Sequence, residues 1–216
     1  MQFESVPAIF TGGCLFLAVV LFAGHFTPGY SHARQSISEL GMPGAVYGWL
    51  VRWVGFVPLG LSFILFAFQS GSLFSNHIPF VLFLVTGLSI LFAGIFPTDP
   101  DNRRDTPSGK IHASAVIMLL LLLSASPFTF SIASLYENPP AEWFLVFSFV
   151  MGIPVSIVLA LSSYGISSRW TALFQRTAQP PLPGLQQRLL LALHYIWWSV
   201  FSRVLAGEYL LFSSGI

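Results

Sequence analysis

The chain has 216 residues, of which 55% are hydrophobic and only 8% are Asp, Glu, Lys or Arg, and its formal net charge is +1. Soluble globular proteins carry about 25% charged residues, so this composition excludes that class and predicts an integral membrane protein. Without a basic face, a nucleic-acid partner is not expected, and membrane lipids are the expected partners. The single cysteine, Cys14, excludes an intramolecular disulfide and a cysteine-based zinc site.

Long stretches without charge define the predicted membrane spans. The longest covers 46 residues between Arg52 and Asp99, and a polar stretch at residues 69–77 divides it into two spans. About 20 apolar helical residues cross a hydrocarbon core about 30 Å thick, and in lipid each backbone amide must be bonded within its own element. The prediction is an all-α polytopic bundle of six transmembrane helices in a single domain, 1–216, with spans at about 7–27, 48–67, 78–96, 111–135, 143–164 and 185–205.

Prolines mark both the ends and the interiors of these spans. Thr106 before Pro107 predicts a helix N-cap followed by proline at the first helical position. Pro58, Pro127 and Pro154 fall inside spans. Each removes one backbone donor, so each frees a carbonyl that a neighbouring helix, a serine or water can satisfy.

The fifth loop has two interpretations. Residues 169–176 place Trp170, Leu173 and Phe174 at helical spacing between two arginines, which is typical of a short amphipathic helix lying on the membrane surface. The alternative is an unstructured linker that ends at the prolines of residues 180–183.

Basic residues predict the orientation of the bundle. Eight of the nine lie in or beside the first, third and fifth loops, and Arg203 alone lies by the other side. The eight are Arg34, Arg52, Arg103, Arg104, Lys110, Arg169, Arg176 and Arg188. By the positive-inside rule these loops face the cytoplasm, so both termini face away from it, and in a bacterium the protein lies in the inner membrane.

Polar residues able to do chemistry map to the same predicted cytoplasmic end. They are His25, Ser31, His32, Ser36, Ser38, Glu39, Asp99, Asp101, Asp105 and His112. Two histidines with a carboxylate are typical ligands of zinc or non-haem iron. One hypothesis is therefore a metal-dependent membrane hydrolase acting on lipid, with His32, Asp99 and His112 as metal ligands, Glu39 as general base and Ser38 or Ser31 orienting the substrate.

Other interpretations of these residues remain open. Ser36 and Glu39 match a capping box, in which both side chains satisfy amides at the start of a short helix. In a second class, a small transporter or lipid-handling protein, the cluster binds an anionic headgroup or solute. In a third class, a structural or sensory protein without turnover, the cluster only ties loops together. The sequence does not choose among these three classes.

His194 lies about 9 Å into the sixth span, counted by helix rise from Arg188. An ionisable group at that depth is a functional candidate. A neutral histidine bonded to a serine or carbonyl of another helix is an equal alternative.

The chain also resembles a family of multi-pass prokaryotic membrane proteins catalogued as domain of unknown function 998, over about residues 8–206. The residues that carry the resemblance are Tyr30, Ser31, residues 37–41, residues 94–97, Asp99, His112, Gly184, Leu185, Arg188 and Trp197. The resemblance implies a six-helix membrane protein without an established activity. It also implies that Ser38, Glu39, Asp99 and His112 are family-like positions on one face.

Overall fold

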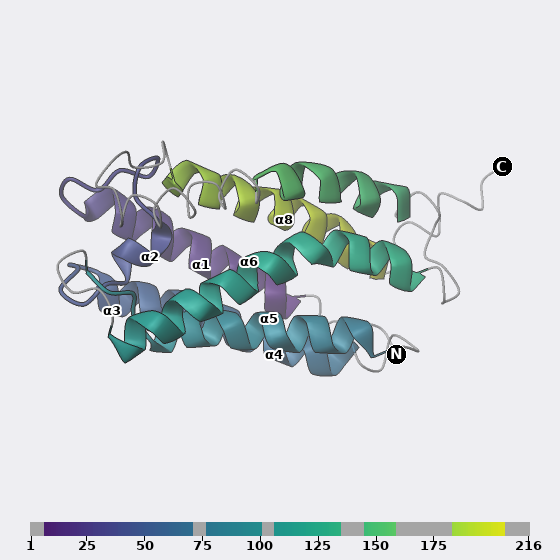
Figure 1. Ribbon diagram of the computed structural model, residues 1–216, viewed down its shortest axis with the longest axis horizontal. Helices are drawn as coiled ribbons and strands as arrows, with labels where there is room; N and C mark the ends of the chain where they lie inside the picture. The colour runs from purple at the N-terminus through teal and green to yellow at the C-terminus, as the bar shows by residue number, and fades with distance from the viewer. Residues whose placement is uncertain (1–6, 71–76, 101–105, 135–144, 159–182, 206–216) are drawn as a thin grey trace.

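All regular secondary structure in the described part of the chain is helical. The computed structural model describes residues 7–70, 77–100, 106–134, 145–158 and 183–205. Six long helical segments lie side by side along the long axis of the molecule, and consecutive segments run in opposite directions (Figure 1). The predicted all-α bundle is confirmed.

Each predicted span corresponds to one of these segments. The long helices are α1 (Pro7–Phe26), α4 (Val57–Ser70), α5 (Ile78–Ile95), α6 (Pro107–Ser134), the unlabelled helix Leu145–Val158 and α8 (Pro183–Leu205). The second span is composite, because α3 (Gly48–Leu50) and a π-helical turn (Val51–Phe56) continue into α4. The turn ends two residues before Pro58, which cannot donate a backbone hydrogen bond. A short helix, α2 (Ile37–Leu40), follows α1.

Four segments are long and apolar enough to cross a membrane: Ile9–Phe26, Gly48–Gln69, Ile78–Ile95 and Pro107–Ile132. Leu145–Val158 is apolar but shorter, and α8 is long but contains Arg188 and His194. The protein is therefore an integral, multi-pass membrane protein. The surface helix predicted at residues 169–176 lies outside the described residues.

α4 and α5 pack with their backbones in contact at two glycines. A Cβ atom at Gly60 would lie 2.7 Å from the backbone nitrogen of Leu91, and one at Gly87 would lie 2.8 Å from the carbonyl oxygen of Gly60. Because lipid tails are as apolar as leucine, membrane helices gain stability from such close van der Waals packing.

Aromatic side chains fill the centre of the bundle between α5, α6 and α8. Trp197 is 0% exposed, and its ring stacks on Phe201 with centroids 5.3 Å apart. Phe130 of α6 contacts both rings, and Phe83 of α5 contacts Phe130 and Phe201. The indole Nε1 of Trp197 donates to Ser148 Oγ at 3.0 Å, which ties α8 to the helix Leu145–Val158.

Pro127 explains the buried position of His194. Proline at 127 leaves the carbonyl of Leu123, four residues earlier, without its usual helical donor. His194 Nε2 from α8 bonds to this carbonyl, and Ser126 Oγ donates to it at 2.9 Å. His194 is only 2% exposed, so this bond lies deep in the bundle. Of the two sequence interpretations, the structure places His194 in a hydrogen bond to another helix.

One end of the bundle collects the polar loops (Figure 1). It contains the segment after α1 with α2, residues 96–100 after α5, and the first turns of α6 and α8. We call this region the polar end.

Candidate functional site

Arg188 connects α8 to the segment that follows α1. Its Nη1 donates to the carbonyl oxygen of His32 at 2.6 Å and to that of Gln35 at 3.1 Å, and its Nη2 donates to Tyr30 Oη at 2.7 Å. Nη1 also lies 3.0 Å from the carbonyl oxygen of Gly184 in its own helix. Every acceptor among the described residues is therefore a carbonyl or a phenol. One guanidinium holds together residues about 155 positions apart in sequence.

Tyr30 is the second part of this contact. Its hydroxyl donates to the carbonyl oxygen of Ser36 at 2.9 Å, and its ring centroid lies 5.8 Å from Arg188 Cζ, within cation–π range. Burial raises the pKa of the Tyr30 phenol above its ordinary value, while the nearby Arg188 lowers it. The phenol is thus protonated at neutral pH and can donate while it accepts from Arg188.

Backbone contacts strengthen the attachment. The amide of Leu185 donates to the carbonyl of Ala33 at 2.9 Å, and the amide of Ile37 donates to Gln187 Oε1 at 2.8 Å. At Gly184, a Cβ atom would lie 2.2 Å from the carbonyl oxygen of Gln35. Only glycine permits this approach. We call the contacts of α8 with residues 30–37 the Arg188 clamp.

Ser38 and Glu39, the predicted catalytic residues, lie in α2 next to the clamp. Glu39 Oε1 accepts from the Ser36 amide at 3.0 Å and from Ser36 Oγ at 2.9 Å, which forms the capping box expected from the sequence. Ser38 Oγ lies 3.0 Å from Ser36 Oγ. In this arrangement the carboxylate stabilises the start of α2.

His32 packs between α1 and the clamp. Its ring lies where a Cβ atom of Gly24 would be, and its centroid is 5.3 Å from that of Tyr30. Burial lowers the pKa of His32, and the charges of Arg188 and His25 lower it further. The charge of Arg188 therefore opposes protonation of His32.

Asp99 and Thr106 together cap the start of α6. Asp99 Oδ2 accepts from the Thr106 amide at 3.0 Å, Asp99 Oδ1 accepts from the Thr106 hydroxyl, and the Gly109 amide donates to Thr106 Oγ1 at 3.0 Å. A carboxylate at a helix N-terminus is favoured by the helix dipole. These caps explain why α6 begins at Pro107, four residues before the predicted start of the span at 111.

His112 bonds to carbonyl groups at the C-terminal end of the preceding helix. Its Nδ1 lies 2.8 Å from the carbonyl oxygen of Phe96 and 3.0 Å from that of Ala93, at the C-terminus of α5. The side chain is buried, and its Nε2 has no hydrogen-bond partner among the described residues. His112 thus satisfies carbonyls that a helix end leaves free.

The predicted metal ligands are divided between two places. Asp99 and His112 lie at the α5–α6 junction, whereas His32 lies beside the Arg188 clamp. In the part of the chain that the structure describes, no three His, Cys, Asp or Glu side chains form a group able to hold a metal ion. The zinc or iron site predicted at these three residues is therefore not assembled there. Asp101 and Asp105 lie outside the described residues.

The clamp itself is not predicted from the sequence. There, Arg188 marks the edge of a span, and Tyr30 only supports the family resemblance. The available signal was an arginine in the second turn of a predicted membrane helix. No carboxylate lies three or four residues from this arginine. The identity of its acceptors depends on a fold that brings residues 30–37 beside α8.

The fold and the polar end define a multi-pass integral membrane protein with a cationic contact at one end of a helical bundle. The chain belongs to the family described as protein of unknown function (DUF998), whose model matches residues 10–204. The resemblance seen in the sequence is confirmed. No curated protein and no solved structure matches the chain.

Proposed function

We propose that this protein handles lipids and binds anionic lipid headgroups at its polar end. The observation that carries this proposal is the chemistry of the Arg188 clamp. The described acceptors of the guanidinium are neutral carbonyls and a neutral phenol, which orient the cation without cancelling its unit charge. A lipid phosphate is the anion that a membrane supplies at this depth.

The neighbouring groups support an anion site. Arg34 and His25 are exposed at the same end, and the charge of Arg188 opposes protonation of His32. The two carboxylates described there, Glu39 and Asp99, are occupied as helix N-terminal partners. Cations near an anionic membrane surface contribute about 1 kcal/mol each to lipid attraction.

We further propose that the polar end faces the cytoplasm of a bacterium, with the bundle in the inner membrane and both termini outside the cytoplasm. Eight of nine basic residues support this orientation. Single cysteines at Ser72 or Asn138 should then react with a membrane-impermeant thiol reagent from outside, and cysteines at Asn102 or Gln179 should not, with Cys14 replaced by Ala. The reverse labelling pattern would overturn the orientation.

The hydrolase hypothesis has less support. Glu39, its general base, is held in the capping box, and His32 is separated from the two other proposed metal ligands. We therefore do not propose a metal-dependent reaction for these residues.

A measurement of lipid selectivity distinguishes two roles of Arg188, which are binding of a lipid headgroup and a purely structural role. The purified protein is placed in nanodiscs of phosphatidylcholine with a titrated fraction of phosphatidylglycerol, and the bound lipids are counted by native mass spectrometry. Arg188→Gln should reduce the preference for phosphatidylglycerol about fivefold, the effect of one cation. Arg188→Lys should keep the preference although it cannot reproduce the bridging geometry.

Arg203→Gln is the control, because Arg203 lies near the other end of the same helix. It should leave the preference at the parent value. If Arg188→Gln binds phosphatidylglycerol as selectively as the parent protein, the clamp is structural and the proposed function is wrong.

A further inference from the structure

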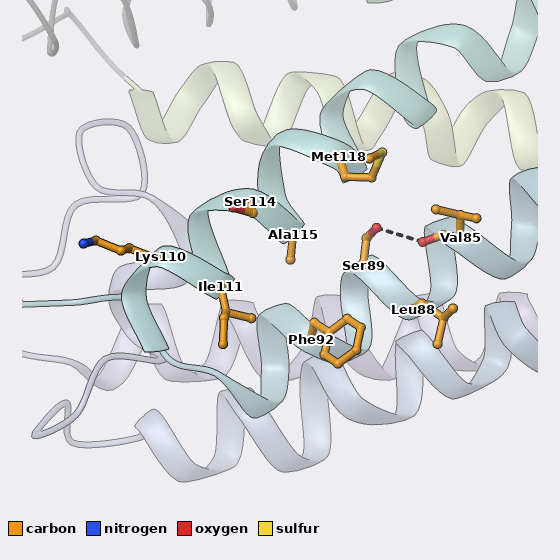
Figure 2. A pocket seen from close by; sticks show the side chains of 9 residues that line it. All are labelled: Val85, Leu88, Ser89, Phe92, Lys110, Ile111, Ser114, Ala115 and Met118. Atoms are coloured by element: carbon orange, nitrogen blue, oxygen red, sulfur yellow. Dashed lines mark hydrogen bonds between the residues drawn. The ribbon is translucent and has the colours of Figure 1, made fainter. Parts of the chain in front are cut away.

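A groove of about 470 Å³ lies between α5 and α6. Figure 2 shows its lining, in which Ser89 and Ala115 lie between larger side chains. Ala115 is only 8% exposed, whereas Met118 is 46% exposed. Two small residues on facing helices thus form the floor of the groove. Its size is within the range of ordinary ligand sites.

The interior of the groove is apolar although it contains serine. Ser89 Oγ donates to the carbonyl oxygen of Val85 at 2.8 Å, so this hydroxyl is satisfied within its own helix (Figure 2). Leu88, Phe92 and Ile111 are partly exposed and flank the groove. These walls suit an alkyl chain and offer little to a polar solute.

Lys110 gives the groove a direction. It lies in the first turn of α6 at the polar end, and Figure 2 shows its ammonium group pointing away from the apolar lining. The distance from Lys110 to Met118 is eight residues of helix, or about 12 Å. This is close to the depth of one leaflet, which is half of a hydrocarbon core about 30 Å thick. The groove therefore has a cation at the headgroup level and an apolar path as long as a leaflet is deep.

From this geometry we propose that the α5–α6 groove binds one acyl chain of an anionic phospholipid, with the lipid phosphate at Lys110. This site is separate from the Arg188 clamp, because it uses other helices and another cation. Charge complementarity selects the occupant, since a zwitterionic lipid fits the apolar walls equally well but gains less from Lys110.

A fluorescent probe inside the groove tests this site. Met118→Cys is labelled with bimane in a Cys14→Ser background, and the protein is reconstituted with brominated phosphatidylglycerol or brominated phosphatidylcholine, whose chains quench the probe on contact. The brominated phosphatidylglycerol should quench at about fivefold lower mole fraction. Lys110→Gln should abolish this difference, and Lys110→Arg should retain it.

Two controls and a separate measurement make the result specific. The same probe at Leu17, an exposed residue of α1 away from the groove, should show no preference between the two lipids. Ser114→Leu narrows the groove and should weaken quenching by both lipids. Quenching at Met118 is measured separately from the lipid count that tests Arg188, so that failure of this site and failure of the proposed headgroup site are told apart.

Two quenching results would overturn the proposal. One is equal quenching by the two lipids at Met118. The other is a preference for phosphatidylglycerol that persists in Lys110→Gln. Soluble glycerol phosphate should not displace the brominated lipid. If it does, the site recognises the phosphate group alone and the assignment of an acyl chain to the groove is wrong.

Discussion

The two halves of the polar end are stabilised in different ways. At the α5–α6 junction, Asp99, Thr106 and His112 satisfy helix ends within 20 residues of themselves. At the Arg188 clamp, side chains of α8 satisfy carbonyls and amides about 150 residues away. Local caps fix where a helix starts or ends. The clamp fixes where two distant segments lie relative to each other, so its loss should disturb more of the molecule.

The largest effect is expected from Arg188→Ala. It leaves the carbonyls of His32 and Gln35 and the hydroxyl of Tyr30 without their donor, and it should reduce the free energy of unfolding by about 3 kcal/mol. The measurement is a reversible unfolding titration with SDS in mixed micelles. Arg188→Lys should lose less, because it keeps a donor. Equal stability of the alanine variant and the parent would mean that the clamp contributes nothing.

A smaller effect is expected from the contact between α6 and α8 in the bundle interior. His194→Leu should cost about 1–2 kcal/mol, because the Leu123 carbonyl loses its donor from α8. In a Pro127→Ala background the alanine amide can donate to that carbonyl, so the same substitution should cost less. The measurement is a double-mutant cycle, and strict additivity would contradict the link between Pro127 and His194.

A local cap should give a still smaller and more confined effect. Thr106→Ala removes the Oγ1 acceptor of the Gly109 amide and should cost about 1 kcal/mol. Hydrogen exchange should rise in the first turn of α6 and remain unchanged at residues 30–37. Increased exchange in both places would show that the junction and the clamp are coupled, so that the cap would not be local.

The smallest effect is expected from pH. The pKa of His32 is lowered in the folded protein, so between that pKa and the unfolded value near 6.5 the unfolded chain binds more protons and stability rises with pH. Acidification through this window should therefore lower the unfolding temperature. His32→Gln should flatten the curve within the same window, and the difference between the two curves isolates His32 from other histidines. Identical curves would exclude a contribution from this side chain.

Sequence reasoning succeeded where contacts are short in range. The spans follow from charge-free lengths, the capping box from Ser36 and Glu39, and the start of α6 from Thr106 before Pro107. Each of these needs only the physics of one helix and its solvent. The predicted metal group depends instead on contacts of long range. Residues at one membrane face share a depth, but depth does not fix their lateral positions, and His32 lies beside another helix than Asp99 and His112.

By itself, the sequence determined that this chain forms a helical membrane bundle, because backbone amides in lipid have no partners outside their own helix. It also placed the polar residues at one end. Only the tertiary structure decided which carbonyls Arg188 binds, which helix supplies a donor to Leu123, and where small residues leave a groove between α5 and α6. Those contacts depend on how helices pack side by side, which is set by the fit of many side chains at once.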